Sequence, residues 1–313
     1  MLRSMSSAIS GMQAFQTDLD TVGNNIANVN TVGFKSSRTD FSDILSQTTS
    51  GGNAPSGTGL GGTNPMQVGL GVKASDIELD MSQGPDQTTS NPTDLAVNGS
   101  GMFVVSPDAK DTAGATTGTY STMFTRAGNF TVDNSGNLVL PNGFVAMGFP
   151  ANSNGTINTT AYTPTGTANL QKMNVDDLFT LSGPHGAAGT AIASAPDVQI
   201  GSDGSVSVAA SDGNRYTVGY ISLANFPNTA GLQKAGDNLF TATAASGQPT
   251  CGQPGDTTKN LGTVTSGELE MSNVDLSNEF AEMITAQNGY VANTHMIGTD
   301  NQVLQALVNM KNS

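Results

Sequence analysis

The chain has 313 residues, of which only 12% are charged, and 25 acidic residues against 11 basic ones give it a net charge of −14. Such a surface repels phosphate backbones, so the composition argues against nucleic-acid binding. The single cysteine, Cys251, excludes an internal disulfide. The 38 glycines, together with many Ser, Thr and Asn residues, favour a β-rich protein with an uncharged polar surface.

The first twenty residues lack the pattern of a secretory signal peptide. Arg3 could begin one, but serines interrupt the apolar run and no small-residue cleavage site follows. No stretch approaches the roughly 20 apolar residues that span a bilayer. We therefore expect no membrane insertion, and we expect any export to use a route that removes no peptide.

The N-terminal segment has the periodicity of an amphipathic helix. Its apolar residues recur at steps of three or four. Gly33 is placed to end the helix, so the pattern predicts a helix over residues 2–30. The apolar stripe consists of Leu2, Met5, Ile9, Met12, Phe15, Leu19, Val22 and Ile26.

The last forty residues repeat this pattern and predict a second helix. Ser272 and Asp275 have the spacing of a capping box, and Met271 with Leu276 could form the accompanying hydrophobic staple. The spacing of both stripes is close to the 3.5 residues of a coiled coil. The second stripe consists of Leu276, Phe280, Met283, Tyr290, Ile297, Leu304 and Val308.

Between the two ends the hydrophobic period shortens to that of β-strands. Residues 124–140 predict two strands around a turn at 134–137, and 198–208 and 214–226 predict further strands. Residues 46–64 are rich in Gly, Ser and Thr without periodicity, which predicts a flexible loop. The weaker pattern of 151–195 indicates an insertion.

These patterns predict an α+β fold of several domains. The terminal helices, residues 1–33 and 272–313, would pair as an α coiled-coil domain. Residues 34–90 would be an extended or loop connector. The mainly β core would comprise 91–150 and 196–271, and it would carry 151–195 as an inserted segment or small outer domain.

No motif predicts a catalytic, metal or cofactor site. The two histidines, His185 and His295, have no nucleophile-elbow sequence beside them. The glycines at 57, 59 and 62 fit G-x-G-x-x-G but lack the preceding strand and following helix that a dinucleotide site requires. The Asp-Gly turns do not have the spacing of an EF-hand loop. We expect a protein that is not an enzyme.

Several segments resemble the bacterial flagellar rod and hook proteins. The resemblance is most specific in residues 19–41, LDTVGNNIANVNTVGFKSSRTDF, and it continues in 64–84, 95–105, 124–151 and 267–297. The ending GFPA at 148–151 and the N-terminal signature are most similar to the hook subunit. The signature residues are Asn24, Asn25, Ala27, Asn28, Thr31, Gly33, Phe34 and Lys35.

The resemblance implies a structural subunit of the extracellular flagellum, in the hook or basal body. Such a subunit is exported without a cleaved signal and self-assembles helically into a tube, with its terminal helices inside. For a hook subunit the tube is a flexible joint that transmits torque, but the short insertion keeps the distal rod as the alternative. The implied partners are further copies of the chain, adjacent rod and hook–filament junction proteins, the hook cap and the flagellar type III export apparatus.

Two expectations concern how the ends behave. Because isolated helices are marginal in water, we expect ends that are disordered in the monomer and ordered in the polymer. We also expect the loop 46–64 to let the β domain shift relative to the tube. A secreted enzyme that uses two carboxylates and a monomeric adhesin are the alternatives, which a hydrolysis screen and sedimentation would distinguish.

Overall fold

The computed structural model describes residues 2–54, 62–107, 121–150, 170–174, 198–209 and 215–311. The chain divides into two compact units. The first, called here the helical unit, comprises Met1–Val29, Ser36–Asp80 and Val274–Ser313. The second, called the β unit, comprises Asn30–Lys35 and Met81–Asn273. Each unit is therefore assembled from segments that are far apart in the sequence.

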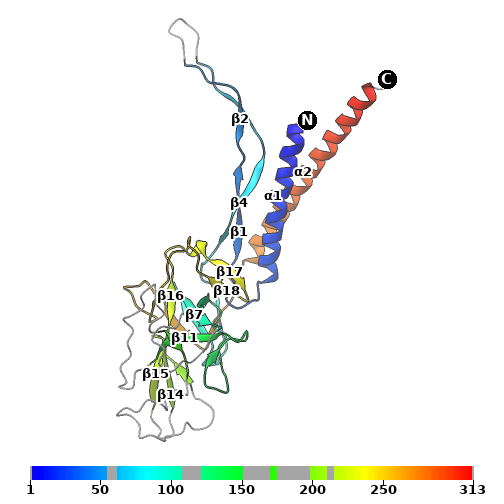
Figure 1. Ribbon diagram of the computed structural model, residues 1–313. Coiled ribbons are helices and arrows are strands. Elements are labelled where there is room, and N and C mark those ends of the chain that lie inside the picture. Colours follow the sequence, from blue (N-terminus) through cyan, green and yellow to red (C-terminus); the bar gives the residue numbers. More distant parts are fainter. Residues whose placement is uncertain are drawn as a thin grey trace. The chain divides into compact units, whose positions relative to one another are not determined.

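Two long helices form the body of the helical unit. Helix α1 (Leu2–Ala27) runs antiparallel beside α2 (Leu276–Lys311), which is orange to red in Figure 1. Near one end of the pair, Ser4 Oγ donates to Asp300 Oδ2 at 2.6 Å. The helix predicted over 2–30 is confirmed as far as Ala27. Its last turn closes with the amide of Asn28, which donates to the carbonyls of residues 24 and 25.

The second helix begins one turn later than a cap at Ser272 requires. The backbone amide of Ser277 donates to Asp275 Oδ1 at 2.9 Å, and Asn278 Nδ2 donates to Asp275 Oδ2 at 3.0 Å. Asp275 is therefore the N-cap, and the predicted capping box at Ser272 is wrong. A carboxylate at this position satisfies free amides and also complements the positive end of the helix dipole.

A β-ribbon completes the helical unit. Strand β1 (Ser37–Asp43) pairs antiparallel with β4 (Val72–Leu79), and β2 (Ser46–Ser50) pairs with β3 (Met66–Gly69). The flexible-loop prediction for 46–64 is thus wrong at 46–50, and residues 55–61 lie outside the described part. Both faces of β2 and β3 are exposed. A strand that buries neither face needs no apolar alternation, which is why its sequence gives no β signal.

The β unit is built around one large antiparallel sheet. Its main path runs β13-β14-β15-β11-β7-β8-β18-β17, and further strands pair at its sides. Two separate pairs, β20 with β6 and β21 with β5, lie off that sheet.

The elements of the β unit have the following bounds: β5 (Asp86–Thr88), β6 (Leu95–Asn98), β7 (Met102–Ser106), β8 (Met123–Thr125), β9 (Thr131–Val132), β10 (Leu138–Val139), β11 (Val145–Pro150), β12 (Gln171–Lys172), β13 (Val198–Ile200), β14 (Ser205–Ala209), β15 (Arg215–Ile221), β16 (Leu223–Asn225), the 3-10 turn η2 (Thr229–Gly231), β17 (Gln233–Gly236), β18 (Leu239–Thr241), β19 (Thr250–Gly252), β20 (Thr263–Ser266) and β21 (Glu268–Glu270).

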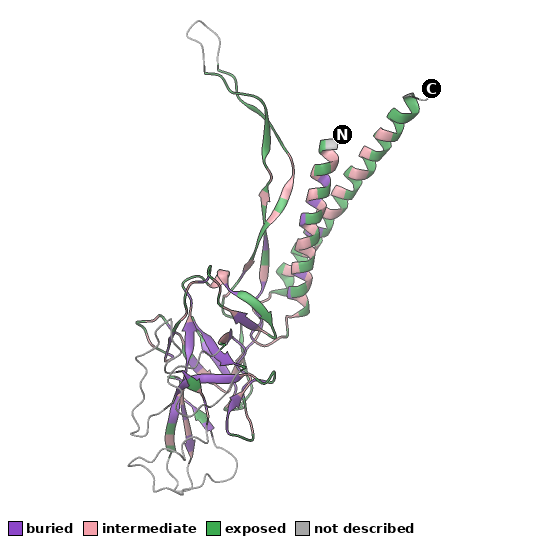
Figure 2. Cartoon of the chain, in the orientation of Figure 1, coloured by how far each residue is buried: buried purple, intermediate pink, exposed green. Residues whose placement is uncertain are grey.

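The hydrophobic core lies in the β unit. Phe103 and Phe130 meet edge to face with ring centroids 5.3 Å apart, and Leu95, Val105 and Leu138 are fully buried beside them. The core strands are purple in Figure 2, whereas α2 is mostly green and pink. Cys251 is buried as well.

The strands predicted from alternation are confirmed within the described residues. Strands β9 and β10 flank the predicted turn at 134–137, and β13 and β14 flank the turn at Asp203 and Gly204. Most of the predicted insertion 151–195 lies outside the described part. Two helices with a mainly β core are therefore the architecture of this chain.

Candidate functional site

The two helices meet along matched stripes of residues. Gly11 of α1 lies against Asn293 of α2, and Phe15 lies against Gly289, between the Ser4–Asp300 contact and the Asn25–Glu279 contact. The contacting residues are 4, 11, 15 and 25 on α1 and 300, 293, 289 and 279 on α2. Within each set, successive residues are separated by seven, four and ten positions, and the two sets run in opposite directions along the chain. Such separations keep one face of each helix toward its partner.

Glycines set how closely the helices approach. A Cβ atom on Gly11 would lie 2.8 Å from Asn293 Nδ2, and one on Gly289 would lie 2.6 Å from the ring of Phe15. Both distances are shorter than atoms tolerate, so each glycine makes room for a larger side chain of the other helix. Ala8 and Ala14 are buried on α1, and Ala286 is buried on α2. Small residues therefore occupy several of the buried positions of the pair, together with Val22 and Asn25.

The predicted apolar stripes lie mostly beside this small-residue seam. On α1, Val22 is buried, Ile9 is exposed, and Met5, Met12, Phe15, Leu19 and Ile26 are partly buried. On α2, Met283, Tyr290, Ile297 and Leu304 are partly buried, and Leu276, Phe280 and Val308 are exposed. Further apolar side chains of α2 are exposed as well, namely Ile284, Val291, Met296, Val303, Leu307 and Met310.

Carboxylates gather at the end of the seam near the start of α2. Burial, and then the charge of Glu282, raises the pKa of Asp18. Burial also raises the pKa of Glu279. The hydrogen bond from Asn25 lowers this pKa, and the charges of Glu282, Asp18 and Asp275 raise it further. Glu279 Oε2 is buried and has no hydrogen-bond partner among the described residues. The carboxyl groups of Asp18 and Glu279 therefore bind protons more readily at this end of the helix pair than in water.

Asn25, from the signature, fixes the chain where it returns to α1. Its Oδ1 accepts from the backbone amide of Ser37 at 3.0 Å, and its Nδ2 donates to the Ser37 carbonyl at 2.8 Å. The second Nδ2 hydrogen reaches Glu279 Oε1 at 3.0 Å. Only an amide of this length offers an acceptor and two donors in this arrangement. Of the other early signature residues, Asn24 and Ala27 are exposed, and Asn28 and Thr31 are partly buried.

The later signature residues belong to the β unit. Gly33 has a positive φ of 67°, and its amide donates to the carbonyl of Glu270 at 2.8 Å. A Cβ there would lie 2.5 Å from the backbone nitrogen of Ala127. Phe34 is buried next to it, and its amide donates to the carbonyl of Thr31 at 3.3 Å. Glycine is thus required at residue 33 both by conformation and by space.

Lys35 belongs to a buried ionic network with one carboxylate between two cations. Its Nζ lies 2.6 Å from Glu270 Oε1, and Arg126 Nη1 lies 2.9 Å from Glu270 Oε2. The side chains of Lys35 and Glu270 are fully buried, and that of Arg126 is 6% exposed. Backbone groups complete the network, since Lys35 also donates to the Ser82 carbonyl and Gly84 N donates to Glu270 Oε1.

Sequence reasoning named Lys35 but not its two partners. Arg126 lies in residues 124–140, which predict two strands, and Glu270 lies in residues 267–297, which resemble the family. Arg126 is the single charge of residues 124–130, but Glu270 follows another carboxylate, Glu268, so the only shared signal is the presence of charge. That signal does not show which charges meet.

Comparisons with known proteins agree with the signature. Residues 5–35 match the family "Flagella basal body rod protein", 96–208 match "Flagellar hook protein FlgE/F/G D1 domain", and 265–310 match "Flagellar basal body rod FlgEFG protein C-terminal". The flagellar basal-body rod protein FlgG of Bacillus subtilis is 42% identical over 99% of this chain and 100% of its own length.

Other relatives carry both names of the family. The FlgG of Caulobacter vibrioides is 34% identical over 97% of this chain and 98% of its own length. The flagellar hook protein FlgE of Borreliella burgdorferi is 29% identical over the full length of both chains. The crystal structure of Helicobacter pylori flagellar hook protein FlgE2 is 13% identical, with a TM-score of 0.41 over 59% of this chain and 100% of that one.

The chain belongs to the flagellar rod and hook protein family. It is a structural component of the bacterial flagellum and not an enzyme. Among the described helices, none combines the length and the hydropathy that crossing a membrane requires. The described residues also contain no cluster of three or more His, Cys, Asp or Glu side chains arranged to hold a metal ion.

Proposed function

We propose that this chain is a rod subunit of the flagellar basal body that assembles helically with further copies of itself. The hook subunit, which the sequence resemblance favours, is the second candidate. Similarity supports the rod, because FlgG of Bacillus subtilis is 42% identical over 99% of this chain and 100% of its own length. The alignment with the hook protein of Borreliella burgdorferi extends over 456 positions, so that relative carries long segments absent from these 313 residues.

The terminal helices pair as a coiled-coil domain in this proposal and form the inner wall of the tube. The opposed stripes of contacts and the glycines at Gly11 and Gly289 support that pairing. The connector 34–90, the core of 91–150 and 196–271, and the outer segment 151–195 would then lie outside the inner wall. The antiparallel pairing of β1 with β4, which has one irregularity between Asp40 and Phe41, supports an extended connector.

Exposed apolar residues of the helices supply the energy of assembly. Phe280, Ile284 and Val308 are each about half exposed in the single chain. Fully burying a side chain of this size stabilises a structure by about 1.5–3 kcal/mol. The stripe residues from Leu2 to Ile26 and from Leu276 to Val308 would therefore form the polymer interface, together with the small-residue seam.

Export and neighbours follow from the same proposal. A chain with two marginal terminal helices passes through the type III export apparatus unfolded and loses no signal peptide. Its neighbours along the axis would be other rod proteins and the first hook subunits. The hook cap and the hook–filament junction proteins would be its neighbours if the chain were the hook subunit.

Electron microscopy of the purified chain under assembly conditions tests the proposal. Straight tubes support the rod, and curved tubes would transfer the assignment to the hook. Immunogold labelling of isolated flagella provides the matching location, with label expected within the basal body and not on the external joint. Particles that remain single at every concentration, with both helices protected from protease, would contradict both assignments.

A further inference from the structure

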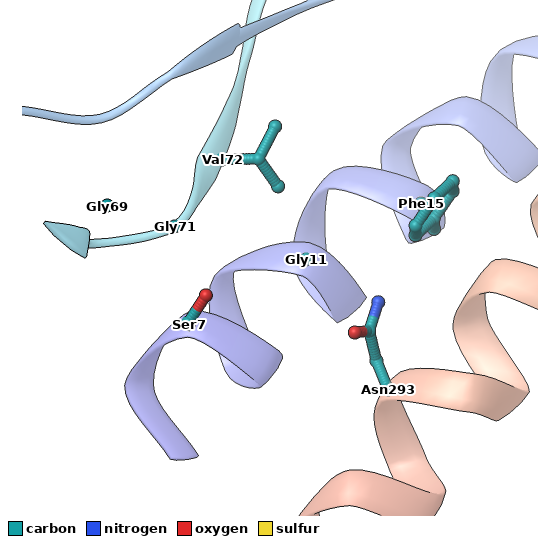
Figure 3. Close-up of a pocket in the computed structure, with 7 residues that line it drawn as sticks. All are labelled: Ser7, Gly11, Phe15, Gly69, Gly71, Val72 and Asn293. Carbon is teal, nitrogen blue, oxygen red and sulfur yellow. The ribbon is translucent and has the colours of Figure 1, made fainter. Parts of the chain in front are cut away.

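A pocket opens on the helical unit between α1, α2 and the ribbon. It has a volume of about 400 Å³, and its lining combines small and apolar residues (Figure 3). The helices contribute Phe15 and Asn293, and the ribbon contributes Val72. This size is at the lower end of the roughly 300–1,000 Å³ of small-ligand sites. The full lining is Ser7, Gly11, Phe15, Gly69, Gly71, Val72 and Asn293.

Glycines create the hollow, and hydrogen bonds hold its walls. A Cβ on Gly69 would meet no atom within 4 Å, so the space above it is open. Gly71 has a φ of +127° and lies directly against Ser10. The amide of Val72 donates to Ser10 Oγ at 3.3 Å, and Ser10 Oγ donates to the Ser7 carbonyl at 2.8 Å. The ribbon and α1 are therefore tied together at the edge of the pocket.

The pocket accepts an uncharged occupant. None of its seven lining residues is charged, and residues 4–17 of α1 contain no charged residue either. The chain as a whole carries a net charge of −14. Two copies would therefore repel one another over most of their surface. The pocket and residues 4–17 of α1 carry no charge and so do not contribute to this repulsion. A charged ligand would also lose its hydration without gaining a partner.

The C-terminal end of α2 offers apolar side chains that lack cover. Ser4 of α1 contacts Asp300, so residues 301–311 continue past this contact by about 16 Å at 1.5 Å per residue, and most of them lie beyond Leu2, where α1 starts. This segment, called here the overhang, contains no charged residue before Lys311. Val303, Leu307 and Met310 are exposed along it at steps of four and three, which places them on one face.

The overhang of one chain does not reach the pocket of the same chain. Asn293 already lines the pocket, and Val303 lies ten residues farther along the same uninterrupted helix. The helix axis therefore carries Val303 about 15 Å away from the pocket. An occupant from the overhang has to come from a second copy.

We propose that the pocket is a socket for an apolar side chain of the overhang of a second copy of this chain. The inference rests on the proposed self-assembly and adds the contact that joins successive copies. The interface is heterologous, because the socket and the overhang are different surfaces. Contacts of this kind continue from copy to copy and generate a helical polymer.

Filling the socket tests the proposal, and a matched glycine provides the control. Gly69→Ile places a side chain in the open space, and Gly51→Ile does the same outside the pocket, where a Cβ also meets nothing within 4 Å. We expect both variants to keep the circular dichroism spectrum of the unaltered chain. Gly69→Ile should raise the critical concentration for assembly roughly tenfold or more, as when an interface loses an anchor. Gly51→Ile should change it by less than about twofold.

Chemical cross-linking provides a second measurement that does not depend on blocking assembly. A Gly69→Cys variant mixed with a Met310→Cys variant should give a cross-linked dimer with a short bismaleimide, and Gly51→Cys in place of Gly69→Cys should not. Failure of the unaltered chain to assemble would overturn the proposed function itself. If the unaltered chain assembles, but Gly69→Ile assembles equally well and no specific dimer forms, the socket is overturned and the proposed function stands.

Discussion

Lys35 Nζ lies 2.6 Å from Glu270 Oε1 with both side chains fully buried, although 234 residues separate them in the chain. The contact joins the end of the signature segment to the strand β21. Glu270 Oε2 is bound in turn by Arg126. One ionic network of the β unit therefore brings together residues from the beginning, middle and end of the sequence.

Removing the shared carboxylate should destabilise the β unit most. Glu270→Gln leaves Lys35 and Arg126 buried without a counter-charge, and we expect it to lower the free energy of unfolding by about 3–5 kcal/mol. Lys35→Met should cost less, since the pair of Arg126 and Glu270 remains. Urea denaturation followed by tyrosine fluorescence measures both changes.

A matched control uses the same substitution at a partly exposed lysine. Lys259 lies 3.8 Å from Asp256, and both side chains are 28% exposed. Lys259→Met should cost no more than about 1 kcal/mol. Equal losses for Lys35→Met, Glu270→Gln and Lys259→Met would contradict the importance assigned to the buried network.

Gly33 should tolerate no side chain. Gly33→Ala places a residue at a φ of +67° and a Cβ 2.5 Å from the nitrogen of Ala127. Gly267 has a φ of +82° but open space around it, so Gly267→Ala carries only the conformational cost of about 1–2 kcal/mol. We expect Gly33→Ala to cost about 1–3 kcal/mol more, from the added overlap. Thermal unfolding of the two variants makes the comparison, and equal costs would show that the space at Gly33 is unimportant.

Asn25→Asp should weaken the contact that holds Ser37, at the start of β1, against α1. The aspartate has no amide hydrogens for Ser37 O and Glu279 Oε1, and it adds a carboxylate next to Glu279. Leaving buried polar groups unpaired costs about 1–3 kcal/mol. Asn24→Asp, on the exposed side of the same turn, is the control and should change little. Hydrogen exchange of the amides in β1 reports the loss, and unchanged protection would refute the role given to Asn25.

Pairing of the helices should weaken as the pH rises from acid to neutral. Burial raises the pKa of Glu279 above its ordinary value of 4.5, and burial likewise raises the pKa of Asp18. The folded state therefore binds these protons more tightly than the unfolded state does. Their stabilising effect is fully present below the unfolded-state pKa and is lost as the pH rises through the folded-state pKa.

Circular dichroism melts of the helices across this pH range measure the effect. Glu279→Gln should flatten the pH dependence, because it keeps the bond from Asn25 without a titrating group. Asp20→Asn removes an exposed charge of α1 and should leave the dependence in place. A pH dependence that is the same in Glu279→Gln would assign the effect to other groups.

Periodicity predicts the two helices correctly, but the apolar stripes that it predicts lie mostly beside the small-residue seam. Met5, Met12 and Leu19 belong to the stripe that periodicity predicts, yet Gly11 and Ala8 are more deeply buried in the contact of the two helices. Hydrophobic patterns measure the size and polarity of side chains. The closest approach of two backbones instead favours residues that have almost no side chain, so the pattern alone does not locate the seam.

Ionic contacts between residues far apart in the chain could not be predicted from the sequence either. Lys35 was recognised as part of a signature, but nothing in the local pattern of Arg126 or Glu270 indicates that the three charges meet. Strand β2 was missed for a different reason, because its exposed residues show no alternation. Local propensity and period describe elements, whereas these features depend on which elements are brought together.

The claim that further copies cover the apolar face of α2 is tested most directly by hydrogen exchange of the full chain before and after assembly. The account predicts fast exchange of the amides of Leu276–Lys311 in the free subunit and strong protection in the polymer, with β7 protected equally in both. Equal protection of that helix in the free and assembled states would contradict it.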